Sequence, residues 1–365
     1  MKKNIYITKP NLPDLDGLLP DLRKIWESRM LTNNGHYHQK FEKALKDFLK
    51  ARNVCLFANG TLALLTGIKA FELTGEVITT PYSFSATAHV IVWNNLTPVF
   101  VDIDPHTFSI DPDKIRENIT SKTSAILAVH VYGIPGALEE YQAIADEYGL
   151  KLIYDAAHAF NVKYNGRDIT SFGDMSMLSF HATKLFSTFE GGALIFKNNS
   201  LKPIIESLKN FAIINEEVVD GVGINSKMNE FQALIGLHSL DIVSDEINKR
   251  KRVAQKYRNL LSKMGGIELL EIPKNLEWNY SYFPILFTGS AAQKRRDDVY
   301  NTLREHNIYA RKYFYPLITK NPFYQRYQCS ELIIAEDVSK RILCLPMYGE
   351  LKEETLYRIA SYIKS

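Results

Sequence analysis

Short runs of apolar and β-branched residues alternate with helical patterns from about residue 52 onward. Seven such runs have the length and composition of β-strands, at residues 53–58, 76–80, 98–103, 124–131, 151–157, 176–180 and 192–196. Between them, apolar residues at helical spacing predict helices at residues 61–73, 112–119 and 138–149. Because alternating strands and helices require crossover connections, the pattern predicts an α/β fold with a mostly parallel sheet covered on both faces.

The pattern changes after about residue 200. Helical spacing continues over residues 228–240 and then over the basic segment 246–264, and a smaller mixed region begins near Gly265. We therefore predict a large domain over residues 1–245 and a smaller C-terminal α+β domain over residues 246–365. No segment rich in Pro, Gly or Ser marks the boundary, so we expect the two domains to pack tightly.

Composition narrows the classes of partner. The chain has 365 residues, 45% of them apolar, which is enough for a sizeable core. Its 44 basic and 41 acidic residues nearly cancel to a net charge of +3, which argues against a nucleic-acid partner. The most basic run, residues 248–252, lies within a helical pattern, and we interpret it as the solvated face of an amphipathic helix, with a phosphate-binding patch as the alternative.

Cysteine and histidine positions do not indicate a metal site. Three cysteines (Cys55, Cys329 and Cys344) without a CxxC pair fit neither a disulfide framework nor a zinc site, and we interpret His36 to His38 as a surface segment. No stretch approaches the ~18 apolar residues of a membrane span. We expect a cytoplasmic protein without a membrane partner.

Candidate chemistry lies where the predicted strands end, because ligands of open parallel sheets bind beyond the carboxyl ends of the strands. Asp155 follows the apolar residues of KLIYDAAHAF. A carboxylate at such a position either caps the next helix or, buried and ionised, pairs with a protonated ring nitrogen of a cofactor.

Two further strand ends carry weaker signals. In FANGTLALLTG, Gly60 and Thr61 open a predicted helix, and free amides with a hydroxyl at a helix start form an anion site, although neither GxGxxG nor GxxxxGK is present. In PYSFSATA, Phe84 either stacks on a planar ring or simply packs.

Lys184 lies in FHATKLFSTFEGG, close after Ser179. A lysine whose amine is neutral can form an imine with an aldehyde. An acid, a lysine, an anion-binding turn and an aromatic residue, each at a strand end, are together what pyridoxal phosphate requires. Their order along the chain therefore predicts a site for this cofactor.

The same segments resemble a known family. ANGTLAL, TTPYSFSATAH, PVFVDID, AVHVYGIPG, YDAAHAF, FHATKLFSTFEGG, GINSKMNEFQALIGLHSL and LPMY are similar, in order, to motifs of the DegT/StrS nucleotide-sugar aminotransferases. The resemblance covers essentially the whole chain. It implies the aspartate aminotransferase-like fold (fold type I of the pyridoxal phosphate enzymes) and a homodimer with active sites at the subunit interface.

The resemblance also implies residue roles. Lys184 corresponds to the lysine that holds the cofactor, Asp155 to the partner of the ring nitrogen, and Phe84 to the residue stacked on the ring. His158 matches the position beside the ring hydroxyl. The phosphate-binding positions correspond to Gly60, Thr61, Ser179 and, from the other subunit, Asn225.

Departures from the family pattern are few. Lys227 stands where arginine is common, and Asn161 where small residues are common. His181 receives no catalytic role. The family's dehydratase branch has histidine in place of the lysine, so Lys184 favours amino transfer.

The wider context is similar to the branch that aminates C4 of dTDP-4-keto-6-deoxy-D-glucose with L-glutamate, through pyridoxamine phosphate, for O-antigen and lipopolysaccharide synthesis. Arg311 and Tyr313, in ARKYFYPL, are either contacts to the nucleotide diphosphate of this substrate or structural residues. The alternatives are a 3-aminotransferase, a sugar dehydratase, or a non-catalytic regulatory protein with this fold.

Overall fold

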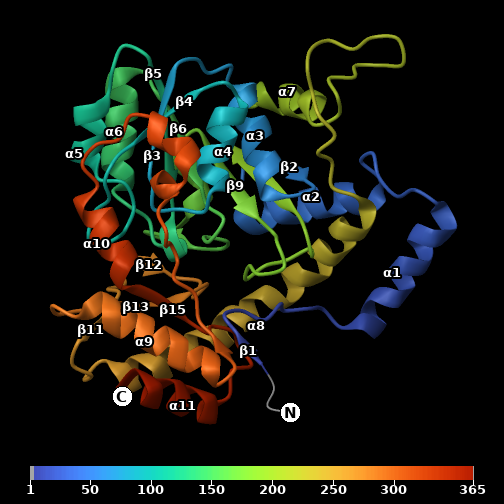
Figure 1. Cartoon of the computed structure of the whole chain (residues 1–365). Helices are drawn as coiled ribbons and strands as arrows, with labels where there is room; N and C mark the ends of the chain where they lie inside the picture. The colour runs from blue at the N-terminus through green and yellow to red at the C-terminus, as the bar shows by residue number, and fades with distance from the viewer. Residues whose placement is uncertain (1–3, 365) are drawn as a thin grey trace.

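A seven-stranded sheet forms the centre of the computed structural model, which describes residues 4–364 (Figure 1). The strand order is β2-β10-β9-β6-β5-β3-β4, and only β10 runs antiparallel to its neighbours in this sheet. The predicted strands are all present, as β2 (Asn53–Phe57), β3 (Glu76–Thr79), β4 (Thr97–Phe100), β5 (Thr123–Val129), β6 (Lys151–Asp155), β9 (Met175–Ser179) and β10 (Gly192–Phe196). The predicted α/β fold with a mostly parallel sheet is confirmed.

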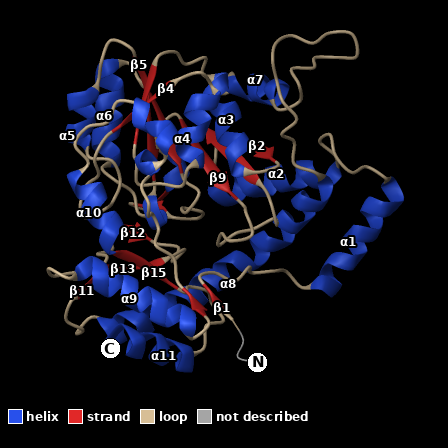
Figure 2. Cartoon of the chain, viewed as in Figure 1, coloured by secondary structure: helices blue, strands red, loops and turns tan. Residues whose placement is uncertain are grey.

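Helices cover both faces of this sheet (Figure 2). Successive side chains of a strand point to opposite faces, so Val54 and Leu56 of β2 enter one apolar core, and Cys55 and Phe57 enter the other. The first core is closed by α2 (His36–Leu49), α5 (Pro112–Asn118) and α6 (Leu138–Tyr148). The second is closed by α3 (Gly60–Ala70), α4 (Ala86–Trp93) and α7 (Leu201–Leu208).

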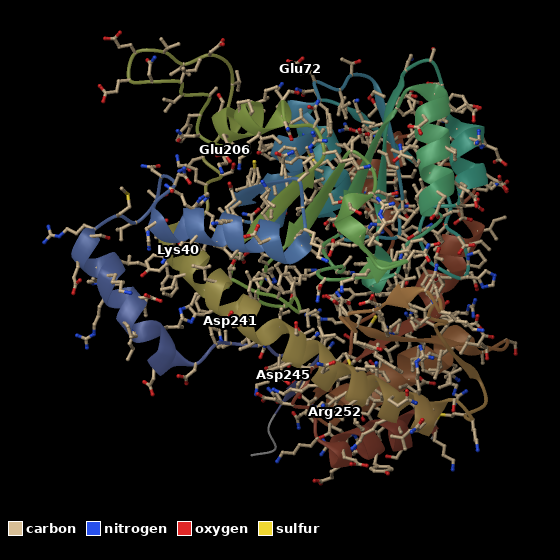
Figure 3. The ribbon with its side chains drawn as sticks, turned by 180° about the vertical axis from the view of Figure 1, so that it is seen from behind. Lys40, Glu72, Glu206, Asp241, Asp245 and Arg252 are labelled. Carbon is tan, nitrogen blue, oxygen red and sulfur yellow. The ribbon has the colours of Figure 1, made fainter. Side chains whose placement is uncertain are left out.

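One long helix, α8 (Glu230–Leu261), joins the two parts of the chain. It begins with a capping box, in which Asn229 and Gln232 each accept a hydrogen bond from the other's backbone N–H. Val243 packs in the core of the large sheet, whereas Val253 packs in the C-terminal core, so we propose that the two domains divide within this helix. Seen from behind, Asp241, Asp245 and Arg252 lie along α8 (Figure 3) and are exposed.

The C-terminal part is built on a three-stranded antiparallel sheet, β11 (Ile267–Leu269), β13 (Phe283–Phe287) and β15 (Ile342–Leu345). Its helices are α9 (Ala292–Glu305), α10 (Ile333–Arg341) and α11 (Glu353–Lys364), with two short 3-10 helices, η3 (Ile318–Lys320) and η4 (Pro322–Arg326). This mixture of helices and antiparallel strands is the predicted α+β architecture.

The N-terminal segment contacts both parts. Strand β1 (Ile5–Tyr6) pairs in parallel with β14 (Ile308–Tyr309) of the C-terminal part, and helix α1 (Leu15–Ser28) then packs through Leu18 and Ile25 into the large-domain core. The remaining elements are η1 (Val131–Gly133), η2 (Ile169–Ser171) and a small sheet of β12 (Leu276–Glu277), β7 (Lys163–Tyr164) and β8 (Arg167–Asp168). Between residues 4 and 364, no helix is long and apolar enough to cross a membrane.

Two predictions about surface segments are each wrong at one buried residue, although the neighbouring Arg252 and His36 are exposed as predicted. Arg250, in the basic run, is 0% exposed, because its guanidinium pairs at 2.7 Å with the buried Glu246 one turn earlier. His38 lies on the inner side of α2 and is also buried. In both cases helical geometry places a polar residue against the core, where burial is tolerated because the residue is paired or neutral. Burial lowers the pKa of His38 to about 4.

Candidate active site at the carboxyl edge of the central sheet

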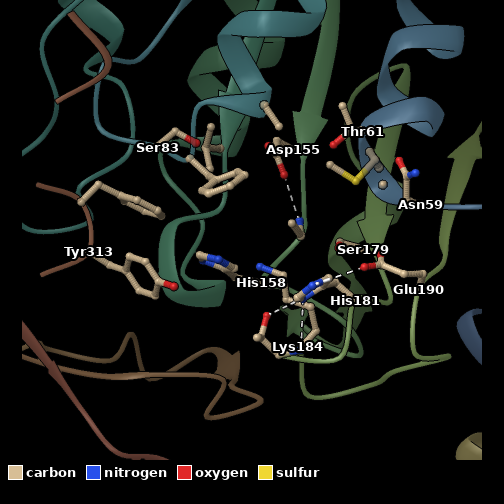
Figure 4. Close-up of a pocket in the computed structure, with 18 of the residues that line it drawn as sticks. Asn59, Thr61, Ser83, Asp155, His158, Ser179, His181, Lys184, Glu190 and Tyr313 are labelled. Carbon is tan, nitrogen blue, oxygen red and sulfur yellow. Dashed lines mark hydrogen bonds and ion pairs between the residues drawn. The ribbon is translucent and has the colours of Figure 1, made fainter. Parts of the chain in front are cut away.

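A cavity of about 540 Å³ opens at the carboxyl ends of β2, β3, β6 and β9 (Figure 4). Most of its lining residues follow directly on these strand ends, as the topology of an open parallel sheet requires. The C-terminal part closes the cavity with Tyr282, Tyr313 and Phe314. Eight of the predicted site residues line it together: Gly60, Thr61, Phe84, Asp155, His158, Ser179, Lys184 and Tyr313.

Lys184 lies on a tight turn that follows β9. The turn is closed by the backbone N–H of Lys184, which donates to the carbonyl oxygen of His181 at 2.8 Å. Burial lowers the pKa of Lys184 to about 8, and the negative charge of Asp155 opposes this shift. About a tenth of the amine is therefore neutral at pH 7, and the neutral form is the one that acts as a nucleophile.

Asp155 ends β6 and is only 5% exposed. Burial raises the pKa of its carboxyl group, while hydrogen bonds from Thr87 (2.8 Å) and from the backbone N–H of Ala157 (3.1 Å) act in the opposite direction. Turns follow Asp155, so the alternative that it caps a helix is wrong. The carboxylate instead faces the cavity, where a cation can pair with it (Figure 4).

An anion-binding corner lies at the start of α3. Asn59 caps this helix by accepting a hydrogen bond from the backbone N–H of Leu62 at 2.9 Å, and Gly60 and Thr61 form its first turn. The first amides of a helix have no partner within it and favour negative charge. Ser179 closes the corner, so closely that a Cβ atom on Gly60 would lie 3.0 Å from the Cβ of Ser179.

His158 is buried on the side of the cavity nearest the C-terminal part. Its ring centroid lies 4.6 Å from that of Tyr282, and burial, followed by the positive charge of Lys184, lowers the pKa of His158 well below 6.5. The imidazole is therefore neutral near pH 7. Phe84 lines the same cavity and is 64% exposed, so its side chain is accessible for stacking.

Two predicted residues lie outside this cavity. Arg311 lines a second cavity of about 460 Å³ that shares Ser83, Phe84, Tyr313 and Phe314 with the first. Asn225 is exposed and forms an isolated backbone bridge with Asn210. It therefore does not reach the cavity of its own chain.

Several residues of the site were not predicted. Thr87 lies in the motif that also contains Phe84, but its partner Asp155 is 68 positions away, so no local pattern indicates the contact. Tyr282 and Phe314 reach the site only because the C-terminal part packs against the sheet. Glu190 lines the cavity and lies 3.4 Å from the imidazole of His181.

The residues present fit pyridoxal phosphate. A lysine of lowered pKa can bind its aldehyde, Asp155 can pair with its ring nitrogen, and the start of α3 can bind its phosphate. The histidine, cysteine and acidic residues between positions 4 and 364 form no cluster of three or more that could hold a metal ion.

Comparisons with known proteins agree with this geometry. Residues 17–364 match the model of the DegT/DnrJ/EryC1/StrS aminotransferase family. A protein of Escherichia coli named dTDP-4-amino-4,6-dideoxy-D-glucose transaminase is 46% identical over 99% of this chain and 98% of that relative. A Shigella dysenteriae protein of the same name is also 46% identical, over 100% of this chain and 99% of that relative. The crystal structure of DesI with its TDP-sugar product superposes with a TM-score of 0.94 at 32% identity, covering 100% of this chain and 93% of DesI.

Proposed function

Because the chain belongs to the DegT/DnrJ/EryC1/StrS aminotransferase family, we propose that it transfers an amino group from L-glutamate to C4 of dTDP-4-keto-6-deoxy-D-glucose. The product is then dTDP-4-amino-4,6-dideoxy-D-glucose, an amino sugar for cell-surface glycans. The observation that carries the proposal is Lys184, a partly buried lysine of lowered pKa that shares one cavity with Asp155. The two relatives that are 46% identical over at least 98% of their length support the choice of sugar.

The enzyme is a pyridoxal-phosphate-dependent aminotransferase. When bound, the cofactor supplies an aldehyde that carries the amino group between the two substrates and a ring that accepts electrons. The amides of Gly60 and Thr61 and the hydroxyl of Ser179 would bind the phosphate group, and Phe84 would stack on the ring. Asp155 keeps a proton on the ring nitrogen, because a buried carboxylate stabilises the positive charge beside it.

Lys184 moves the proton of the reaction. Its Nζ would take a proton from the glutamate carbon that loses nitrogen and would deliver one to the keto carbon of the sugar that receives it. A pKa of about 8 suits both halves of this task, because the group titrates close to the working pH. His158, neutral and buried, would donate a hydrogen bond to the ring hydroxyl.

We assign the second cavity to the nucleotide diphosphate. Arg311 and Tyr313 line it, together with Lys312 and Lys320, and guanidinium groups bind phosphate in a bidentate manner. Lys312 is already paired with Asp297, and Lys320 with Glu336 at 2.5 Å. The side chain of Arg311 forms no hydrogen bond or ion pair with any of residues 4–364. It is therefore the cation most available to the substrate.

The active enzyme is a homodimer in this proposal. The segment between α7 and α8 extends away from the body of the chain (Figure 1) and exposes Ile214, Val219 and Val222, the last of them to 84%. Asn225 ends this segment outside its own cavity. A second copy of the chain that covers the segment would place Asn225 at the partner's anion-binding corner.

Three free cysteines support a reducing, cytoplasmic setting.

The purified protein with added cofactor, L-glutamate and a panel of 4-keto and 3-keto dTDP-sugars tests the function. We expect an amino sugar from the 4-keto substrate, with the new C–N bond at C4 by NMR. Amination at C3, or loss of water instead of amino transfer, would overturn the choice of reaction. Lys184→Ala should lose at least about a hundredfold in turnover, since general acid–base catalysis contributes that much.

A further inference from the structure

Asp155 is bound by a chain of two hydroxyl groups that come from a different part of the sheet. Thr87, in the first turn of α4, lies with its Oγ1 2.8 Å from Oδ2 of Asp155. The hydroxyl of Ser83 lies 2.7 Å from the same Oγ1 atom. Thr87 is 0% exposed and Ser83 is 5% exposed, so water does not compete for these bonds.

The direction of the bonds follows from the atoms available. An ionised carboxylate has no hydrogen, so it can only accept, and the single hydroxyl hydrogen of Thr87 must point at Asp155. Thr87 can then only accept from Ser83, whose hydrogen points at Thr87. Both dipoles therefore point their positive ends toward the carboxylate. If Asp155 were protonated, this order would be lost.

The remaining surroundings of Asp155 make this contact important. Burial disfavours the charged form of the carboxyl group, and the nearest opposing charge is the ammonium of Lys184, which is itself partly neutral. The backbone N–H of Ala157 satisfies Oδ1. Thr87 is thus the one side chain among residues 4–364 that donates a hydrogen bond to this carboxylate.

We propose that Thr87 is a positioning residue that keeps Asp155 ionised and directed at the ring nitrogen of the bound cofactor, with Ser83 as the outer member of the chain. The inference rests on the proposed role of Asp155. A purely structural alternative is that the Thr87 hydroxyl only satisfies its own burial beside a polar neighbour. The two differ in whether removing the hydroxyl changes the ionisation of Asp155.

Thr87→Val tests the proposal, because valine has nearly the same shape and no donor. Thr87→Ser is the conservative rescue, since it retains the hydroxyl. Thr66→Val is the matched control: Thr66 is 3% exposed in α3, lies outside the cavity, and its Oγ1 has no hydrogen-bond partner between residues 4 and 364. Each change is also made with Asp155→Asn, so that the coupling of position 87 to the carboxylate is measured in a cycle.

The first readout uses the cofactor-free protein. The folded-state pKa of Asp155 lies above its ordinary value of 3.8. The contribution of Asp155 to the stability of the fold is therefore complete below pH 3.8 and is lost as the pH rises through the folded-state pKa. We compare the thermal midpoint of each protein with its Asp155→Asn version across this range. In Thr87→Val, the pH at which this loss of stability is complete should rise by about one unit or more. A shift of this size corresponds to the free energy of one hydrogen bond to a charged group.

The second readout is the affinity for pyridoxal phosphate, from fluorescence titration. Thr87→Val should weaken it about tenfold or more, Thr87→Ser less than about threefold, and Thr66→Val not at all. If Thr87→Val matches Thr66→Val in both readouts, the hydroxyl is structural and the proposal fails. If Thr87→Val does not fold, Ser83→Ala decides, with a smaller shift in the same direction expected and no shift overturning the proposal. Failure of the unaltered chain to bind the cofactor would instead refute the proposed function.

Discussion

The backbone N–H of Tyr132 donates a hydrogen bond to Nδ1 of His158 at 3.2 Å. An imidazole nitrogen that accepts such a bond carries no hydrogen, so the neutral ring must carry its proton on Nε2. The Tyr132 backbone is held in a left-handed conformation (φ 55°) by Trp278, which donates to its carbonyl at 2.9 Å, and by Tyr82, whose hydroxyl lies 2.7 Å from its own. The backbone N–H of Tyr132 is therefore held in place as a donor. Because it fixes the proton of His158 on Nε2, that nitrogen is the donor that His158 presents to the cavity.

Replacing His158 separates its hydrogen bond from its bulk. His158→Gln keeps an N–H group near the position of Nε2, and we expect cofactor affinity and turnover within about threefold of the unaltered protein. His158→Phe fills the site without a donor and should weaken cofactor binding about tenfold. Fluorescence titration with pyridoxal phosphate measures both. Equal losses in the two variants would mean that the imidazole acts through packing against Tyr282 instead.

Much of the site could be predicted because it is built on consecutive strand ends. Parallel strands place their carboxyl ends at one edge, so Gly60, Phe84, Asp155 and Lys184 had to meet there once the alternation of strands and helices was recognised. The end of each strand can also be located from its own segment of sequence, since turn residues bound each apolar run. The fold and the centre of the chemistry were therefore accessible without coordinates.

The supporting residues were not accessible in this way. Thr87 donates to Asp155 across 68 positions, and the backbone of Tyr132 contacts His158 across 26, so both depend on which strands become neighbours. Arg250 belongs to a basic run and is therefore expected at the surface. Only the packing of α8 against Ser281 shows that it is buried. A local sequence pattern predicts the helix or strand to which a residue belongs. Its hydrogen-bonded partners from other helices and strands are determined by tertiary packing.

Gly60 should tolerate no side chain at the anion-binding corner. A methyl group there would meet the Sδ of Met177 and the Cβ of Ser179, each at 3.0 Å, and would push the phosphate away from the first amides of α3. We expect Gly60→Ala to weaken cofactor affinity about tenfold. Gly17→Ala in the first turn of α1 is the control, because its nearest contact is 3.7 Å away, and its cofactor affinity should be unchanged. Unchanged affinity in Gly60→Ala would place the phosphate elsewhere.

His181 supports the turn that carries Lys184. Its Nδ1 accepts from the backbone N–H of Thr183 at 3.2 Å, a contact that asparagine can reproduce. We expect His181→Asn to retain nearly full turnover and His181→Ala to lose about threefold to tenfold, the range of one hydrogen bond. If asparagine is as poor as alanine, the contact between Nε2 and Glu190 at 3.4 Å is the one that matters. Glu190→Gln would then reproduce the loss.

Shared active sites can be tested by mixing two inactive chains. Lys184→Ala lacks the nucleophile, and Asn225→Asp places a negative charge where the proposed dimer brings Asn225 to the partner's phosphate. A mixed dimer contains one site with both native residues, contributed by different chains. After unfolding and refolding the two together, we expect about one quarter of full activity, because half the dimers are mixed and each has one intact site. No recovery, with dimers present by sedimentation, would contradict the proposed role of Asn225.

The protonation of Lys184 should control how fast the cofactor attaches. Only the neutral amine attacks the aldehyde, and a pKa of about 8 leaves about a tenth of it neutral at pH 7. The attachment rate of the cofactor-free protein, followed by absorbance, should therefore rise with pH and level off above a midpoint near 8. Asp155→Asn should lower this midpoint, because the carboxylate is the charge that raises the pKa of Lys184 against the effect of burial. A midpoint near 10.5, the ordinary lysine value, would show that the amine is solvated, and Lys184→Ala should show no attachment at any pH.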